Sequence, residues 1–478
     1  MSVVGVALSA AVAGTLWLPM RPVPAEAPCL RPTRAGTQVQ GDVRVCPGRY
    51  RIADPGERGV IIAAASGTRI DLTGVTLESG DSVPARYTGF GIASRGVDGV
   101  TVLGGVVRGY RFGVRIEGGR GHRVSGIDVS GSRAQRLSST AGQADSADLI
   151  DAGHLTAIDS YGGGLLLKGT VGATVTGVTA RGAQNGLGLV DARDSYVADN
   201  DLSGNSGWGL HLWHSSHNEI ARNNIAHTRR CEISGGCGAA AVLLREGSDS
   251  NTISGNDLSA SSTGVIVAGE PPLTRPSIGN LFHRNDASLA LESGFVARQT
   301  WATTFLENRA DSSGSGFRLI RVSATTLRGN TVIGSRDAGI AASGGADNML
   351  QQNVLAGGRV GVEVLAGDAA TPPSRGYRID DNVIGGTTRG IVLTGVARSR
   401  IRGNVIDRVD EALVIDAAGH ATEVTGNVFL RATRSYVVAP DLEAGGNYWA
   451  TTDAAAAGAK VRGRISVLPW KPASAAGY

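Results

Sequence analysis

The segment Gly207 to Ile225, near the middle of the chain, carries side chains that could do chemistry. His211 and Trp213 occupy one parity of an alternating stretch, LHLW, and two leucines occupy the other. This period of two is typical of a β-strand with one face inward and one face outward. An imidazole can act as a general base near neutral pH, and an indole offers a flat apolar face to a sugar ring. A further imidazole, that of His214, follows where the strand ends.

Charged side chains at equivalent places in neighbouring segments complete a set that suits acidic sugars. Elimination or C5-epimerisation of a polyuronate needs the carboxylate neutralised and the α-proton removed. Arg245 or Arg298 could do the first through the guanidinium fork, and His211 or His214 the second. The candidate catalytic residues are His211, His214, Arg245, Glu246 and Asp191, and the candidate substrate-binding residues are Trp213, Lys168, Arg298, Arg318 and Arg321.

Hydrolysis is an alternative chemistry for the same set, because a glycosidase needs two carboxyl groups. Asp191 and Glu246 stand two repeat units apart, with His214 between them. Two units at about 4.8 Å each would separate their backbones by about 9 to 10 Å, which suits inversion better than retention.

Each of these residues also has a purely structural interpretation. Trp213 could pack under the loop that holds Cys231, and the two histidines could be structural or solvated. Arg245 and Glu246 could belong to a surface charge network. The functional interpretation is favoured by the gathering of aromatic, imidazole and guanidinium groups on the same few repeat units.

A short repeat must position these residues. Each unit has a Gly, an alternating strand, a polar turn, an Asn and a second short strand. Successive Asn lie mostly 22 or 23 residues apart, with three longer steps of 33, 29 and 29. A unit this short holds two or three strands but no helix, so the units are expected to stack in parallel, with Asn bonded to Asn between rungs. The ladder is Asn200, Asn223, Asn256, Asn285, Asn308, Asn330, Asn353, Asn382, Asn404 and Asn427.

Composition favours one elongated all-β domain. The 478 residues could fill two or three ordinary domains, yet no linker-like break follows the N-terminal region. Glycine accounts for 70 residues, about twice its usual share, and aromatic residues for only 5%. The net charge of +4 is modest and the arginines are scattered, which argues against a nucleic-acid partner.

The N-terminal region and the cysteines indicate export. Residues 1–27 are predicted to be a signal peptide, followed by a β-helix over residues 28–450 and a capping tail over residues 451–478. An uncleaved anchor is the alternative, because no Lys or Arg precedes the apolar run. The mature chain should contain no membrane span. Two local disulfides, Cys29 with Cys46 and Cys231 with Cys237, are expected in an oxidising compartment.

The rungs resemble the right-handed parallel β-helix repeats of the pectin-lyase-like superfamily. The segments CPGRYRI and GVIIAAASGTRIDLTGVTLESG are similar to the first coils of its members. The rungs and the terminal GGNYW most resemble the periplasmic copper-binding family of nitrous-oxide-reductase maturation and its secreted relatives, grouped as carbohydrate-binding proteins and sugar hydrolases. The resemblance implies a single-stranded right-handed parallel β-helix, here of about thirteen rungs, in a secreted or periplasmic protein.

Motifs of the best-known enzymes of this fold are missing from the sequence. We find no Asn-Thr-Asp with a paired Asp-Asp as in polygalacturonases, and no Asp-Pro-His as in mannuronan epimerases. Three methionines in the whole chain supply no His/Met cluster for copper. No metal site is therefore predicted. Calcium stays open as a cofactor, although no compact Asp/Glu site is visible.

Insertions point to the same rungs as the candidate residues. The step of 33 contains Cys231 and Cys237, and the first step of 29 contains GEPPLTRPS. We expect these loops to wall an open groove above the outward strand face, held stiff by the disulfide and the prolines. The third insertion, Asp368 to Ser374, lies several rungs away and is expected to serve another purpose.

The sequence thus predicts an exported, monomeric β-helix protein that binds an acidic polysaccharide in a groove on one strand face. As an enzyme it would be a polysaccharide lyase or epimerase, and next a glycoside hydrolase. The alternative is a non-catalytic periplasmic or surface protein that binds carbohydrate or assists copper delivery.

Overall fold

The computed structural model describes residues 28–140, 142–143, 145–150, 156–231, 236–269, 275–367, 373–417, 421–451 and 453–469. The predicted signal peptide, residues 1–27, lies outside the described residues.

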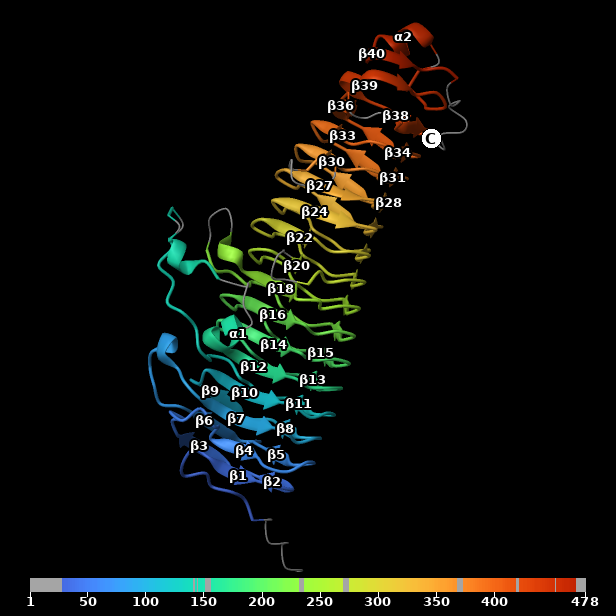
Figure 1. The fold of residues 1–478 in the computed structure, drawn as a ribbon. Helices are drawn as coiled ribbons and strands as arrows, with labels where there is room; N and C mark the ends of the chain where they lie inside the picture. The colour runs from blue at the N-terminus through green and yellow to red at the C-terminus, as the bar shows by residue number, and fades with distance from the viewer. Residues whose placement is uncertain are drawn as a thin grey trace, which may run out of the picture.

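The described chain winds into a long stack of short parallel strands (Figure 1). The longest sheet contains 17 strands, which is more than the predicted thirteen or so rungs. Its strands are β1 (Thr37–Val39), β4 (Ile61–Ala63), β7 (Phe90–Arg95), β10 (Phe112–Glu117), β12 (Gly163–Lys168), β14 (Asn185–Val190), β16 (Trp208–Trp213), β18 (Ala240–Arg245), β20 (Val265–Ala268), β22 (Ser293–Arg298), β24 (Ser315–Ser323), β27 (Ala338–Ala346), β30 (Val360–Leu365), β33 (Arg389–Thr394), β36 (Val409–Ile415), β39 (Ala432–Glu443) and β40 (Val461–Ser466).

A second sheet contains 15 strands and forms the next side of each turn of the coil. Its strands are β2 (Asp42–Arg44), β5 (Arg69–Asp71), β8 (Thr101–Leu103), β11 (Arg123–Ser125), β13 (Thr174–Thr176), β15 (Tyr196–Ala198), β17 (Glu219–Ala221), β19 (Thr252–Ser254), β21 (Leu281–His283), β23 (Thr304–Leu306), β25 (Thr326–Arg328), β28 (Met349–Gln351), β31 (Arg378–Asp380), β34 (Arg400–Arg402) and β37 (Glu423–Thr425).

The third side consists of two shorter sheets, joined through the middle rungs by isolated parallel bridges. One holds β3 (Gly48–Arg51), β6 (Val75–Glu78) and β9 (Val106–Arg108), and the other holds β26 (Thr331–Ile333), β29 (Val354–Ala356), β32 (Val383–Gly385), β35 (Val405–Asp407) and β38 (Val428–Phe429). Helices are few and short among the described residues: α1 (Thr156–Tyr161), α2 (Ala454–Gly458) and the 3-10 turns η1 (Pro84–Arg86), η2 (Ser146–Asp148) and η3 (Gly236–Gly238).

The interior of the coil is apolar and is closed by the predicted asparagine ladder. Asn223 shows the pattern: its Nδ2 donates to the carbonyl of Val197 at 3.0 Å and to Oδ1 of Asn256 at 3.0 Å. Its own Oδ1 accepts from the backbone N and the Nδ2 of Asn200. The ladder runs through all ten predicted positions and continues to Asn447. Buried turn backbone is thereby paired, as the repeat requires. The chain is a parallel β-helix, as predicted.

One rung is much longer than the others. Val114 of β10 pairs with Leu165 of β12, so this rung is more than twice the basal length of 22 or 23 residues. The extra chain, residues 132–162, contains η2 and α1, and α1 lies beside the long sheet near β12 and β14 (Figure 1). The insertion therefore lies on the outward face on which the candidate residues are found.

Candidate functional site

The predicted columns on the outward face are in the expected register. Val190 pairs with Trp213, which pairs with Arg245, and the position before Trp213 on the same face, His211, pairs with Leu243. Parallel strands in register align residues that are distant in sequence, so the predicted columns contain the correct neighbours. Register does not decide which of these side chains contact solvent.

The structure corrects the expected exposure of His211 and Trp213. His211 is 0% exposed and Trp213 is 8% exposed, although both point away from the interior of the coil. The His211 ring lies 4.5 Å from the ring of Trp208 and 6.1 Å from that of Trp213. Trp213 packs in an apolar cluster that includes Ile158 of α1. These rungs carry a covered second core instead of an open groove.

Burial strongly affects the imidazole of His211. Desolvation, together with the positive charge of Arg245, lowers its pKa from 6.5 to about 3. Neither ring nitrogen has a hydrogen-bond partner among the described residues. His211 is therefore neutral at ordinary pH and closed to a substrate in this conformation.

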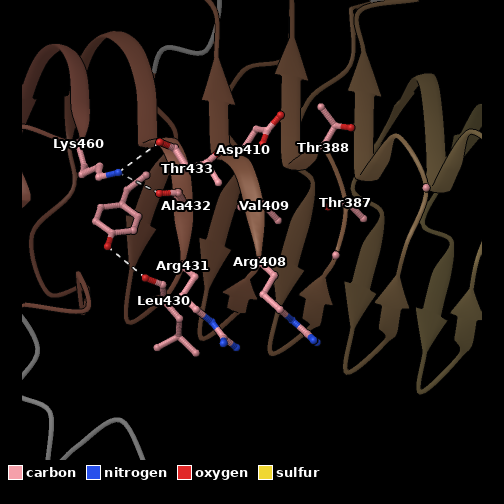
Figure 2. A pocket seen from close by; sticks show the side chains of 13 residues that line it. Thr387, Thr388, Arg408, Val409, Asp410, Leu430, Arg431, Ala432, Thr433 and Lys460 are labelled. Carbon is pink, nitrogen blue, oxygen red and sulfur yellow. Dashed lines mark hydrogen bonds between the residues drawn. The ribbon is translucent and has the colours of Figure 1, made fainter.

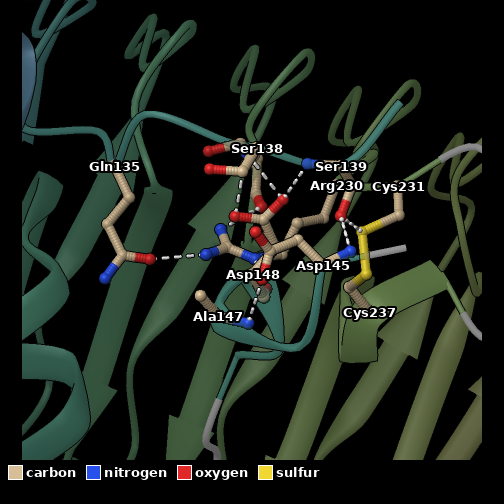
Figure 3. The surroundings of a disulfide bond; sticks show 10 residues. Gln135, Ser138, Ser139, Asp145, Ala147, Asp148, Arg230, Cys231 and Cys237 are labelled. Carbon is tan, nitrogen blue, oxygen red and sulfur yellow. Dashed lines mark hydrogen bonds between the residues drawn. A yellow bond between two sulfur atoms is a disulfide. The ribbon is translucent and has the colours of Figure 1, made fainter. Parts of the chain in front are cut away.

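Two insertions form the cover over these rungs. We call the described parts of residues 132–162 and 230–238 the cover. Figure 3 shows the Arg230 guanidinium between the Gln135 side chain and the backbone of Asp148, with the Cys231–Cys237 disulfide beside Ser139. The loop with the disulfide was expected to wall a groove; it helps to close one instead.

A buried carboxylate stiffens the cover. Asp148 accepts backbone hydrogen bonds from Ser138 at 2.9 Å and from Ser139 at 2.6 Å (Figure 3). Burial opposes ionisation of Asp148, but these hydrogen bonds and the charge of Arg230 outweigh it and lower the pKa. Both predicted disulfides are formed.

Lys168 contacts the cover and is not part of an open groove. Its Nζ lies 3.6 Å from Oδ2 of Asp159 in α1, and Arg115 pairs with the other oxygen of the same carboxylate at 3.1 Å. These ion pairs link α1 to the strands beneath it. The side chain of Arg245, three rungs beyond Lys168, is half-buried.

Three other predicted residues lie together on an open edge. His214 Nδ1 is 2.7 Å from Oδ1 of Asp191, and the two side chains are 51% and 44% exposed. Glu246 follows on the next rung, because His214 donates its backbone N–H to the carbonyl of Arg245. This turn edge joins the long sheet to the second sheet. A carboxylate that holds one imidazole nitrogen leaves the other available for proton transfer.

The outward face reopens at β22 and β24, where it is rich in arginine. Arg318 is exposed and Arg298 half-buried, and they occupy neighbouring strands. Glu292, which sequence reasoning missed, lies close to these two arginines. Burial raises the pKa of its carboxyl, whereas the charges of Arg318 and Arg298 and a hydrogen bond from Thr263 oppose the rise. No feature of the repeat distinguishes Glu292, because it precedes its strand.

Arg321 lines a pocket on the same turn edge as His214. The pocket has a volume of about 260 Å³, and we call it the Trp301 pocket; its lining residues are Trp301, Arg321, Ser323, Gly345, Ala346, Pro373 and Arg375. Sequence reasoning missed Trp301, although a Trp in a turn where most other rungs carry small or polar residues was a usable signal.

A larger polar pocket of about 690 Å³ lies near the C-terminal end of the stack (Figure 2). Its polar groups are paired within the chain: Thr433 Oγ1 donates to Asp410 at 2.7 Å, and Lys460 Nζ donates to the carbonyl of Ala432 at 3.0 Å. None of the predicted site residues lines it.

Fold and site together define a parallel β-helix protein with one covered stretch and one open, arginine-rich stretch on its outward face. The profile of a family described as periplasmic copper-binding protein (NosD) matches residues 64–304 and 246–458. The chain belongs to this family. Membership of a periplasmic family and the two disulfides agree with the predicted secreted or periplasmic location.

Several solved structures are similar. The Dettilon tailspike protein is 16% identical, with a TM-score of 0.47, and the match covers 65% of this chain and 59% of the tailspike. PfbA, a surface adhesin of Streptococcus pneumoniae, is 12% identical with a TM-score of 0.43, covering 83% of this chain and 84% of PfbA. The A-module of the Azotobacter vinelandii mannuronan C-5 epimerase AlgE6 is 14% identical with a TM-score of 0.42, covering 82% and 91%. Such identities concern the fold alone. No curated protein sequence matches.

The described residues do not fit a copper ion. They contain no group of three or more His, Cys, Asp or Glu side chains that could hold a metal. All four cysteines are in disulfides and so supply no thiolate. In the same described ranges, no helix is long and apolar enough to cross a membrane.

Proposed function

We propose that the protein binds an acidic polysaccharide along the open part of its outward face and the adjoining turn edge. The observation that carries this proposal is the convergence of Arg298, Arg318 and Arg321 on two adjacent strands. Val296 and Arg298 of β22 pair in register with Arg318 and Ile320 of β24, and Arg321 follows directly. Guanidinium groups repeated along a surface suit carboxylates or sulfates repeated along a glycan.

The charge balance of this surface supports an anionic ligand. Glu292 is the carboxyl placed among these three arginines, and burial raises its pKa. One carboxylate does not offset three guanidinium charges. The arginines lie on a rigid stack of strands, so little ordering free energy is lost on binding.

Binding is tested by calorimetric titration of the full chain with polyuronate, sulfated and neutral glycans. We expect wild-type protein to bind an acidic glycan, with affinity that falls as salt is raised because the contacts are ionic. Arg298→Gln and Arg318→Gln should each weaken binding by at least about tenfold.

The matched control is Arg328→Gln. Arg328 ends β25 on the second sheet, in the same rung as β24, and its Nε donates to Gln352. This variant should bind like wild type. The proposal is overturned if wild-type protein binds none of these glycans. It is also overturned if the protein purifies with stoichiometric copper, and that result would support the copper-accessory alternative.

We propose catalysis on the bound glycan as a second function, supported by the hydrogen bond between His214 and Asp191. Asp191 would fix the ring orientation, and the free nitrogen of His214 would remove the α-proton of a uronate. Activity is followed by the ultraviolet absorbance of unsaturated uronate products for elimination, and by the ratio of uronate epimers for epimerisation.

The variants that test catalysis are His214→Ala and, as a control, His217→Ala. Loss of the base should slow turnover by about 100-fold or more, whereas His217 lies exposed in the same turn and should be dispensable. Equal turnover in the two variants, or no turnover by wild-type protein on any glycan it binds, would exclude this role of His214.

A further inference from the structure

We infer that the Trp301 pocket is a subsite for one acidic sugar residue, with the indole of Trp301 as its platform and Arg321 and Arg375 as its anion-binding groups. This inference rests on the proposed function.

The pocket is built by one column of turn residues on successive rungs. Trp301 bridges in parallel to Ser323, Ser323 pairs with Ala346, and Ala346 bridges to Arg375. Three rung spacings separate Trp301 from Arg375, or roughly 14 Å of backbone. The small side chains of Ser323 and Ala346 between them form a low floor. The column thus places an aromatic face at one end of a shallow depression and a guanidinium at the other.

The aromatic end is open to solvent. Trp301 is 42% exposed, and Ile278, its neighbour on the preceding rung, is 44% exposed. Trp301 and Ile278 thus place two exposed apolar side chains next to each other on neighbouring rungs. Stacking against the apolar face of a sugar ring buries this surface and keeps the ring hydroxyls in water.

The charge of the pocket selects an anion. The described residues that line it include two arginines, Arg321 and Arg375, and no acidic residue. Arg321 and Arg375 are therefore the charged groups that the described lining offers to a ligand, and guanidinium groups favour a carboxylate.

The described ends of two insertions lie at the two ends of this column. The described end of one insertion, Pro276, lies against the turn after β20, and that of the other, Pro373, lines the pocket beyond β30. Between them lie only the turns of β22, β24 and β27. Trp301 therefore lies on a rung between these two described ends.

The inference is tested by calorimetry with three probes: a galacturonate trisaccharide, a mannuronate trisaccharide and neutral maltotriose. We expect wild-type protein to bind at least one uronate trisaccharide more tightly than maltotriose. Trp301→Ala should weaken that binding at least tenfold, and Arg375→Gln should weaken it to the level of the neutral sugar. Circular dichroism and thermal unfolding confirm that the variants fold.

Arg378→Gln is the matched control, because Arg378 is exposed in the same rung as Arg375 but on the second sheet. It should retain wild-type affinity. If Trp301→Ala and Arg375→Gln also retain it while Arg298→Gln and Arg318→Gln do not, the subsite is wrong and the proposed function stands. If wild-type protein binds no acidic glycan, both the subsite and the proposed function are wrong. Inorganic sulfate is also added as a competitor of the uronate trisaccharide. If sulfate weakens trisaccharide binding equally in wild type and in Trp301→Ala, the site binds an anion without using the indole, and the inference is overturned.

Discussion

Burial of the His211 imidazole makes the unfolding free energy of the protein depend on pH. The imidazole is enclosed between indoles, and burial together with the charge of Arg245 lowers its pKa from 6.5 to about 3. Above pH 6.5 the ring is neutral in both folded and unfolded chains and contributes no pH dependence. Between about 6.5 and about 3 only the unfolded chain takes up the proton, so the stability falls as the pH falls.

We predict that His211→Phe removes this part of the pH dependence. Below pH 6.5 the unfolding free energy of wild-type protein should fall more steeply than that of the variant, by up to about 1.4 kcal/mol per pH unit. Urea unfolding at about pH 7.5 and about pH 5 measures the difference. Exposed His217→Phe serves as control and should keep the wild-type slope; equal slopes in all three proteins would contradict the buried, neutral imidazole.

At the scale of elements, the asparagine ladder ties each turn of the coil to the next. From Asn200 to Asn427, the Nδ2 of each ladder Asn donates to a backbone carbonyl of the preceding rung and to Oδ1 of the next ladder Asn. Loss of one amide therefore leaves groups on two rungs without partners, in a place that water does not reach.

Asn223 and Asn224 allow a matched test of the ladder. Asn223 is buried in the ladder and its neighbour Asn224 is exposed. We predict that Asn223→Ala lowers the unfolding free energy by about 3 kcal/mol, because a buried donor or acceptor without a partner costs about 1–3 kcal/mol. Asn224→Ala should cost about 1 kcal/mol or less. Equal losses in chemical denaturation would show that the ladder adds no stability beyond ordinary turn residues.

The cover is the second element with a consequence for function. It adds Ile158 and Ile150 to apolar side chains that point outward from the rungs beneath, and the ion pairs of Asp159 attach it to the strands. The outward strand face of the rungs that hold His211 and Trp213 is thereby covered, whereas the turn edge with His214 stays exposed. The open stretch begins beyond them, where the arginines and Trp301 lie.

At the scale of the whole molecule, a stack of parallel strands has an exposed edge at each end. At the C-terminal end β40 pairs in parallel with β39, a strand of 12 residues. An uncovered long edge strand is a template for pairing with another chain.

We predict that deletion of residues 451–478 causes association. Light scattering after size exclusion should show wild-type protein as a monomer and the truncated chain as larger, concentration-dependent species. Deletion of residues 470–478 alone leaves β40 in place and should leave the protein monomeric. A monomeric 451–478 deletion would show that β40 is not needed to protect the edge.

Much of the fold was predictable because it repeats. The alternation after each Gly and the spacing of Asn223 from its ladder neighbours are local patterns, and parallel stacking in register converts them into columns. The pairing of Trp213 with Arg245 and the closeness of Asp191 to His214 followed from the same rule.

The cover was not predictable from this rule. Residues 132–162 carry no repeat, and their place over His211 and Trp213 depends on contacts such as those of Arg230 with Gln135. The Trp301 pocket was missed for a related reason: the depression beside Trp301 depends on the small residues Ser323 and Ala346 of the following rungs.

The sequence by itself determined the parallel coil, its ladder and the order of side chains along each outward column, because these depend on short periodic patterns that every rung repeats. Only the tertiary structure decided which part of that outward surface is open. Insertions do not follow the repeat. Whether an insertion covers a rung depends on packing contacts between residues far apart in the chain. For this reason the proposed site does not include the covered His211 and Trp213 of β16. It lies further along the stack, at the arginines and the exposed Trp301.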